Sequence, residues 1–454
     1  MKAAVPKSGA ILVLFALALL TGCGGHAATP APRNAGAAPG YGPNEPPVTI
    51  EFWYMPNGPA PDRDMSREVE RFHAQHPNIT VRATKLDWAE ALTRLNTAAA
   101  SGAGPDVAQL GTTWVGGITA LGALQPFTAQ QLDGLGGRGA FLQASWTSTH
   151  LAGHPEVTAV PWFVDVRAIF YRSDILARLH LDPRAAFANW SSFEATLARI
   201  KARGGIAALG QPGKNDWNVV HNIAPFIWDA GGDLLSPDGA EPAVDTAAAV
   251  TGVDYYQRLV GRFNSRTTLQ KNSTDAQNAF ADGQTAVFIS NPEAVAVYEA
   301  GGKRRAGLRA GWATAPLPAG PKGRYTFFGG SDLSIWKRSR HPAAAYEWVR
   351  FLTGDESQQR FVSAIGLWPA RTAVAARAPF ATEPAYKAFA EQLADGRQYP
   401  AVAAWTDLEA ALQKSFSVLW DRVAASDAPL PRDQVDALLA RTNADMKLVI
   451  KQAG

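Results

Sequence analysis

Residues 48–81 read VTIEFWYMPNGPAPDRDMSREVERFHAQHPNITV, and the periodicity of these residues indicates how the folded body begins. Apolar and polar residues alternate over 48–53, which is the period of a half-buried strand. After a loop rich in Pro and Gly, apolar residues recur with helical spacing over 65–72, and Pro77 ends that helix. Alternation resumes at 79–81. The stretch therefore predicts a strand, a helix and a second strand.

The same pattern continues along the chain. A helix is predicted at 88–100, a stop at 102–105 and a short strand at 107–110, and this order favours parallel α/β packing. The apolar pattern of further segments predicts strands at 168–171, 286–290 and 333–336. It predicts helices at 191–203, 343–353 and 433–450.

The N-terminal residues have the pattern of an export signal. Lys2 and Lys7 precede an apolar run at 11–20, and Cys23 follows at once. Ten apolar residues at ~1.5 Å each span about half of a ~30 Å hydrocarbon slab, so a transmembrane helix is the weaker alternative. The order Leu-Thr-Gly-Cys resembles a bacterial lipoprotein signal, which implies a signal peptide at 1–22 and lipidation of Cys23. An ordinary signal peptide with an accidental thiol remains the alternative.

A flexible tether is predicted after this signal. Residues 24–47 contain 5 Gly, 6 Pro and 6 Ala and show no periodic apolar pattern. We therefore expect a lipid-anchored tether at 23–47 that holds a folded body, 48–454, outside the membrane.

Composition and motifs exclude several functions. The formal charge is only +3, and no Lys or Arg run is longer than 303–305, so we expect no nucleic acid partner. The glycine pattern at 134–139 follows a polar stretch rather than a strand, and no nucleotide-loop, zincin or nucleophile-elbow motif occurs. We expect no catalytic residue, no metal site and no cofactor.

Aromatic residues suggest a ligand instead. The chain has 14 Trp and 10 Tyr but few charges. A sugar presents apolar C–H faces and a rim of hydroxyls, so its site needs flat rings for stacking and polar side chains for hydrogen bonds.

A series of motifs spread over the body resembles the extracellular solute-binding proteins that deliver sugars to ABC importers. The matching stretches are 50–53, 72–81, 101–107, 160–174, 190–194, 279–286, 315–318, 328–331 and 366–371. The resemblance implies a periplasmic-binding-protein-like α/β fold of two lobes, with several chain crossings and a ligand cleft between them. Approximate boundaries are 48–160 plus 293–340 for lobe 1 and 161–292 plus 341–454 for lobe 2.

Asp165 is the leading polar candidate for the ligand site because it interrupts an apolar strand entry. The corresponding stretch of sugar-binding relatives often supplies a ligand contact, and we include Arg167. The alternative is a structural pair between these two residues.

Residues after strands form the next group, because loops at the ends of parallel strands face a ligand crevice. They are Trp53, Tyr54, Thr112, Thr113 and Trp114, with core packing as the alternative for each Trp. Trp217 lies among polar residues, which favours a stacking platform, and Trp228 lies in an apolar segment.

The remaining candidates follow from the resemblance. Asn291 lies at an expected hinge crossing, where it bonds a hydroxyl or caps a helix. Gly330 and Ser331 offer backbone amides, or form a plain turn. Trp368 is a stacking surface or a core filler, and Arg397 is a hydroxyl ligand or a solvated charge.

These observations favour a monomeric, non-enzymatic lipoprotein that binds a carbohydrate outside the membrane and presents it to a permease. A secreted glycoside hydrolase is the first alternative, because it also needs aromatic rings together with two carboxylates. A surface adhesion or scaffold module is the second.

Overall fold

The computed structural model describes residues 40–213, 216, 218–302, 305–426 and 428–453. The predicted signal peptide, most of the tether, Cys23 and Trp217 lie outside the described residues. Within the described ranges, no helix combines the length and the apolar composition needed to cross a membrane.

The first sheet is built around the stretch that opened the sequence. Its strands are β1 (Val48–Tyr54), β2 (Ile79–Lys85), β3 (Val107–Gly111), β4 (Val160–Val166), β9 (Thr326–Ile335), β10 (Trp368–Pro369) and β11 (Gly396–Arg397). The order is β10-β4-β9-β3-β1-β2, and β11 pairs with β9. The predicted parallel pairing is confirmed for β2, β1 and β3, whereas β3, β9, β4 and β10 pair antiparallel.

The second sheet is smaller and has the order β6-β7-β5-β8. Its strands are β5 (Ala168–Tyr171), β6 (Ala207–Leu209), β7 (Thr285–Ser290) and β8 (Ala313–Ala315). The strands predicted at 168–171 and 286–290 are confirmed as β5 and β7. Every residue of β7 is buried, which explains why its central residues 286–289 form a continuous apolar run rather than an alternating one.

Helices of the first group belong with the first sheet. They are α1 (Pro61–Gln75), α2 (Trp88–Ser101), α3 (Val115–Ala120), α4 (Ala129–Gly134), α13 (Pro342–Thr353), α14 (Asp355–Ser357), α15 (Ser363–Ile365) and α16 (Thr372–Ala375). The two longest early helices begin where the sequence provides the signal. Pro61 opens α1, the side chain of Asp87 accepts from Ala89 N to cap α2, and Gly102 ends α2 with φ of 70°.

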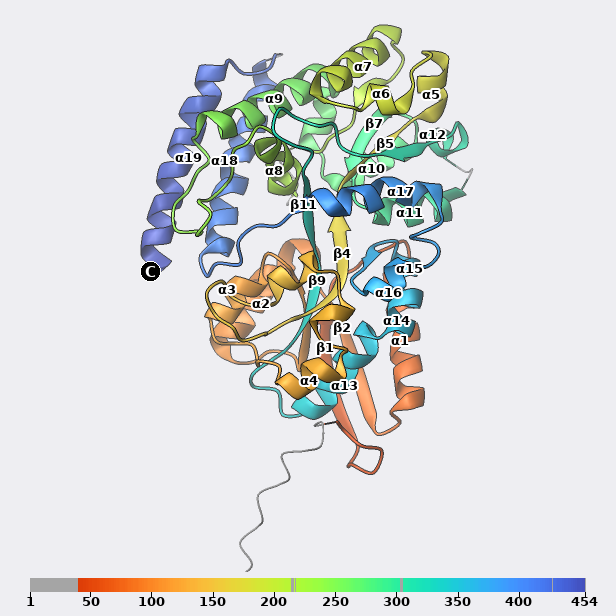
Figure 1. Ribbon diagram of the computed structural model, residues 1–454, viewed down its shortest axis with the longest axis vertical. Helices are drawn as coiled ribbons and strands as arrows, with labels where there is room; N and C mark the ends of the chain where they lie inside the picture. The colour runs from red at the N-terminus through yellow and green to blue at the C-terminus, as the bar shows by residue number, and fades with distance from the viewer. Residues whose placement is uncertain (1–39, 214–215, 217, 303–304, 427, 454) are drawn as a thin grey trace, which may run out of the picture. The chain divides into compact units, whose positions relative to one another are not determined.

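Helices of the second group begin after β5 and are joined by the last two helices of the chain. They are α5 (Ser173–Arg178), α6 (Pro183–Ala186), α7 (Trp190–Arg203), α8 (Val219–Asp229), α9 (Ala247–Phe263), α10 (Ser273–Ala281), α11 (Glu293–Gly301), α12 (Ala306–Arg309), α17 (Pro384–Gln392), α18 (Trp405–Ser426) and α19 (Arg432–Ala453). In Figure 1 the blue helices α18 and α19 lie beside the green helices α8 and α9, which they contact. The helices predicted at 191–203, 343–353 and 433–450 are confirmed as α7, α13 and α19.

Short turns complete the described chain. They are the 3-10 segments η1 (Arg138–Ala140), η2 (Ala144–Thr149), η3 (Arg266–Gln270) and η6 (Leu393–Asp395) and the π segment η5 (Gln358–Val362).

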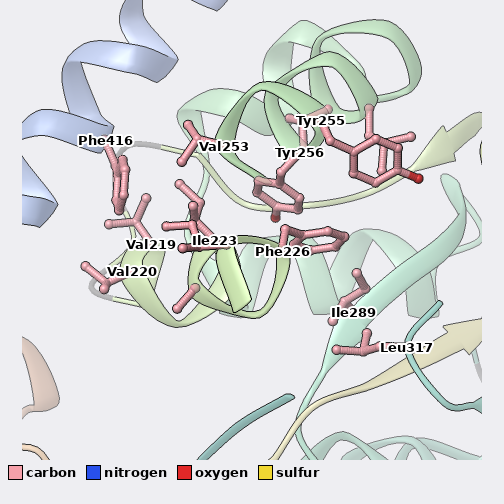
Figure 2. Close-up of a cluster of buried hydrophobic side chains, with 14 of the residues drawn as sticks. Val219, Val220, Ile223, Phe226, Val253, Tyr255, Tyr256, Ile289, Leu317 and Phe416 are labelled. Atoms are coloured by element: carbon pink, nitrogen blue, oxygen red, sulfur yellow. The ribbon is translucent and has the colours of Figure 1, made fainter. Parts of the chain in front are cut away.

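The core around the second sheet is centred on α8, whose described residues are all buried. Figure 2 shows Val219, Ile223 and Phe226 of α8 facing the valine and tyrosine side chains of α9. The ring of Phe226 stacks on Tyr256 at 4.6 Å between centroids. This all-round burial explains why residues 219–228 carry so little charge.

The chain passes between the two sheets at several points, as expected for the predicted α/β fold, which is confirmed. The tightest passage is at Arg167, because it is the single residue between β4 of the first sheet and β5 of the second. The return to the first sheet begins at Thr326, whose hydroxyl accepts from Arg167 N (2.9 Å) and donates to Arg167 O (3.1 Å). Two crossings are therefore fastened to each other.

The packing differs from the expected lobe boundaries at residues 161, 293 and 341. Strand β4 falls, after its first residue, in the expected lobe 2 but is in the first sheet, and β8 falls in the expected lobe 1 but is in the second sheet. Helix α13 follows the boundary at 341 directly but lies against β1, β4 and β9 of the first sheet. The buried Trp348 of α13 forms an edge contact with Phe52 at 5.6 Å between centroids. Sequence periodicity places a helix but does not say which sheet it covers, so we assign α13 to the first sheet.

Candidate functional site

A cavity of about 660 Å³ is lined by residues from elements of both sheets. This volume is within the roughly 300–1,000 Å³ range of small-molecule sites. The first sheet contributes the loop after β1, the start of α2, the residues after β3 and parts of β4 and β9. The second sheet contributes the starts of α8 and α10 and the segment from the end of β7 into α11.

The first-sheet side carries two tryptophans. Trp114 follows β3 and is buried, and Trp88 begins α2 and is half-buried. Their rings meet edge to face at 5.6 Å, and Trp88 Nε1 donates to Pro56 O at 2.8 Å. This hydrogen bond satisfies the indole N–H and leaves the ring plane fixed. We call Trp88 and Trp114 the aromatic wall.

The other side is rich in amides. Asn272, Gln277, Asn278 and Asn291 line the cavity from α10 and the segment after β7. Amide groups both donate and accept hydrogen bonds, so they suit a ligand with hydroxyls. The structure rejects the reading in which the Asn291 side chain caps α11, because α11 has no side-chain cap.

Charged residues gather where the two sheets are joined. Arg167 is 4% exposed, and its Nη2 donates to Asp165 Oδ2 at 3.0 Å and to Asn218 Oδ1 at 2.8 Å. The structural pair of Asp165 and Arg167 therefore exists, and both residues also line the cavity. Burial raises the pKa of Asp165, and Arg167 opposes this rise.

A second acid lies beside this pair and is well satisfied. Asp216 accepts from Ser273 Oγ at 2.7 Å and from Asn222 Nδ2 at 3.3 Å. Its pKa is nonetheless raised because burial outweighs these hydrogen bonds.

Glu293 completes the charged region. It is the first residue of α11, and its Oε1 accepts from Gly58 N of the loop after β1 at 2.6 Å. This hydrogen bond joins elements of the two sheets. Burial raises the pKa of Glu293 to about 7, and the nearby charge of Asp165 adds to the rise.

Behind the charged region lies a buried histidine. His221 of α8 stacks on Phe327 of β9 at 4.0 Å between centroids, and its Nδ1 is 2.9 Å from the Tyr399 hydroxyl. Burial lowers the pKa of His221 well below its ordinary value, so the ring is neutral at pH 7. In the described part of the chain, no group of three or more His, Cys, Asp or Glu side chains is placed to hold a metal ion.

The structure brings many of the predicted ligand residues together. Those in the cavity lining are Thr112, Thr113, Trp114, Asp165, Arg167, Asn291, Gly330 and Ser331. Gly330 has φ of 131°, and a Cβ there would lie 2.1 Å from the Phe163 carbonyl oxygen. Glycine is therefore required by the close pairing of β9 with β4, which also brings the backbone to the cavity.

Two predicted residues at the end of β1 do not line the cavity. The Trp53 ring lies under the guanidinium of Arg94 at 5.4 Å. Tyr54 is buried on Phe52, and its hydroxyl is 3.5 Å from Asp62. The loop from Pro56 to Pro59 reaches the cavity instead.

Trp228 and Arg397 lie together, also away from the lining. Trp228 Nε1 donates to Asp233 at 2.9 Å, and Arg397 pairs with the same carboxylate at 2.7 Å. The guanidinium of Arg397 lies 5.2 Å from the centre of the Trp228 ring.

Trp368 has a similar position outside the lining. It is 3% exposed and contacts the rings of Phe380 and Tyr386. These contacts match the core reading of Trp368.

Several lining residues were not found from the sequence. They are Trp88, Asp216, Asn218, His221, Asn272, Gln277, Asn278 and Glu293. Trp88 had a usable signal, because it follows β2 just as Trp114 follows β3. Asp216 and Asn218 flank the predicted Trp217. The α10 residues had no distinguishing pattern.

The chain matches the model of the bacterial extracellular solute-binding protein family over residues 57–359. It is 24% identical over 376 residues to the diacetylchitobiose binding protein DasA of Streptomyces coelicolor, covering 80% of this chain and 82% of that protein.

Two solved structures have a similar fold. The sugar-binding protein MalE of Xanthomonas citri superposes with a TM-score of 0.73 at 25% identity, covering 90% of this chain and 100% of that one. The GacH receptor of Streptomyces glaucescens, known unliganded and with acarbose, superposes with a TM-score of 0.74 at 22% identity, with the same coverage.

Proposed function

The chain belongs to the bacterial extracellular solute-binding protein family, and we propose that it captures a sugar or oligosaccharide and delivers it to the permease of an ABC importer. The activity of this family is binding rather than catalysis. The observation that carries the proposal is one cavity with an aromatic wall on one side and amide groups on the other. Flat rings suit the C–H face of a sugar, and amides suit its hydroxyls.

Names of the relatives support a carbohydrate ligand. DasA is named for diacetylchitobiose, and the Xanthomonas citri MalE is named a sugar-binding protein. The cavity volume of about 660 Å³ lies in the middle of the roughly 300–1,000 Å³ range of small-molecule sites. This volume allows more than one sugar ring.

Closure around the ligand is the proposed mechanism. Because the lining comes from both sheets, a ligand that touches both walls stabilises the arrangement in which the walls are close. Ligand binding thereby changes the surface that the permease recognises, as in hinge closure of binding proteins.

Anchoring is proposed from the sequence alone. Lys2, Lys7, the apolar run at 11–20 and Cys23 have the order of a lipoprotein signal. A lipid on Cys23 and the tether at 23–47 would hold the monomeric binding domain outside the membrane, near the permease. Replacing Cys23 by Ser is expected to release the protein from the membrane fraction, and retention there would contradict the anchor.

The test of capture is a titration with a panel of mono- and oligosaccharides. We expect saturable heat of binding and a change in tryptophan emission with at least one sugar, because Trp88 and Trp114 line the cavity. That sugar should add about 2.7 kcal/mol to the free energy of unfolding at roughly 100 times its Kd.

Recovery of the ligand distinguishes binding from hydrolysis. The sugar should be recovered intact after long incubation with the protein, whereas shorter products would favour a glycoside hydrolase. No response to any sugar in the panel would overturn the proposed function.

A further inference from the structure

The cavity carries an excess of acid. Its described lining contains four carboxylates, Asp87, Asp165, Asp216 and Glu293, but Arg167 is the only Lys or Arg among these residues. His221 does not add a positive charge, because its lowered pKa keeps it neutral at pH 7. An anionic ligand such as a phosphate ester would meet net repulsion in this cavity.

Two of the four carboxylates already accept hydrogen bonds from groups of the protein. Asp87 is exposed at the rim and caps α2 through Ala89 N. Asp216 accepts from Ser273 and Asn222. The remaining acids, Asp165 and Glu293, share the region beside Arg167, and we call them the carboxylate pair.

One guanidinium is too little for the carboxylate pair. Arg167 brings one positive charge: its Nη2 gives one N–H to Asp165 Oδ2 and the other to the amide oxygen of Asn218. Its Nε, which has no hydrogen-bond partner among the described residues, reaches neither carboxylate. Asp165 Oδ1 is buried and accepts no hydrogen bond of good geometry, although the Asn291 amide is near enough to favour its ionised form. Glu293 Oε1 accepts from the backbone N–H of Gly58, and the neutral Asn291 amide and the more distant charge of Arg167 also favour its ionised form, but burial outweighs them.

The carboxylate pair also joins the two sides of the cavity. Asp165 is on β4 of the first sheet, and Glu293 begins α11 after β7 of the second sheet. The charge of one raises the pKa of the other, as expected for two acids that are close together. A positive group placed between them would favour both ionised carboxylates and would hold the two sides together.

Resting on the proposed function, we propose that the ligand is a basic sugar, whose protonated amine binds between Asp165 and Glu293 while its ring lies against the aromatic wall. The ammonium supplies the hydrogen-bond donors that Asp165 Oδ1 lacks. Neutral hydroxyls of the same sugar meet the amides of α10.

The test compares sugars that carry basic nitrogen with neutral sugars of similar skeleton. Chitobiose and cellobiose share a β-linked skeleton and differ in amine against hydroxyl, and diacetylchitobiose blocks the charge. Acarbose and maltotetraose form a second, α-linked pair. By isothermal titration at neutral pH, we expect the amine-bearing member of at least one pair to bind about 10- to 100-fold more tightly, since hydrogen bonds to charged groups have this strength.

Variants then locate the amine. Asp165→Asn and Glu293→Gln should each reduce the preference for the amine, measured as the ratio of the Kd values of the neutral and the amine-bearing sugar, at least about tenfold. Asp233→Asn is the matched control, because Asp233 lies outside the lining. Circular dichroism and urea unfolding check that each variant folds. If one variant fails to fold, the salt dependence of the native protein decides, since only an ammonium contact should weaken as salt rises.

The outcomes separate the two proposals. Binding of neutral sugars with no gain from the amine would retain sugar capture and overturn the basic-sugar proposal. Tighter binding of inorganic phosphate, or of Ca²⁺ alone at the carboxylate pair, would also overturn it. No binding of any sugar would overturn both proposals.

Discussion

The two sides of the cavity differ in how they recognise a ligand. The aromatic wall, Trp88 and Trp114, offers ring faces whose attraction for the apolar face of a sugar does not depend on pH. The carboxylate pair with Arg167 offers directional hydrogen bonds among buried charges. The aromatic wall therefore selects for a ring, whereas the charged side selects for the charge and position of its substituents.

The difference also concerns stability. Removing a half-buried ring costs contact area, but removing one partner of a buried charge pair leaves the other charge unpaired. The charged side should thus be the more sensitive region, and four measurements test this ranking.

Replacement of Arg167 is expected to have the largest effect. Arg167→Met leaves Asp165 buried without its cation, so the free energy of unfolding should fall by about 3–5 kcal/mol and sugar binding should be lost. Urea unfolding and calorimetric titration measure the two effects. Arg172→Met is the matched control, because Arg172 is also buried and paired, with Asp174, but does not line the cavity. Equal loss of binding in both variants would contradict the special position of Arg167.

The pH dependence of stability should come second. Glu293 has a pKa of about 7 in the folded protein, above its ordinary value of 4.5, so the folded state binds the extra proton between these values. Its contribution is complete below about pH 4.5 and is lost as pH rises through 7. Glu409 and Asp332, each with a pKa raised to about 7 by burial, act in the same direction.

Unfolding curves from pH 5 to pH 8 check this sign. Glu293→Gln should remove about 1–3 kcal/mol of the decline between these pH values. An unchanged slope in the variant would mean that Glu293 does not titrate in this range.

A substitution in the aromatic wall is expected to have a smaller effect, and this effect is on sugar affinity. Trp88→Ala should weaken sugar binding about tenfold, because it removes one ring face at a cost of roughly 1–2 kcal/mol. Trp53→Ala is the control, since Trp53 is also half-buried but lies outside the lining. If both variants bind sugar normally, stacking of the sugar on Trp88 is excluded.

The smallest effect is expected far from both regions. Arg397→Gln breaks a partly exposed ion pair with Asp233, so the free energy of unfolding should change by no more than about 1 kcal/mol. Sugar affinity should not change. A tenfold loss of affinity would return Arg397 to the set of ligand contacts that the sequence predicted.

Much of the fold could be predicted because it depends on local periodicity. The alternation at 48–53 and 79–81 specifies β1 and β2, and the helical spacing between them specifies α1. The antiparallel insertion of β4 and β9 could not be predicted in this way. It depends on which distant strands meet, and β9 pairs across more than 200 residues with β3.

The residues of the site also divide into those that local sequence predicts and those that depend on distant contacts. Asp165 was recognisable because a charge interrupts an apolar strand, and Trp114 because it follows one. Glu293 looks like any acid in the first turn of a helix, where it suits the helix dipole. Only the crossing of the chain brings it to Gly58, which lies 235 residues away in sequence. Trp228 and Trp368 are of a residue type that often binds sugars, but their rings contact Tyr399 and Phe380 in the core.

The single residue between β4 and β5 limits how the protein can open. Two Cα–Cα steps of about 3.8 Å connect Val166 to Ala168, so these strand ends stay within roughly 7.6 Å of each other in every state. The sheets can swing about this point but cannot slide apart there. Distance probes placed near Arg167 should thus stay almost silent during a ligand cycle, and probes at the far tips of the two sheets should report the full angular amplitude.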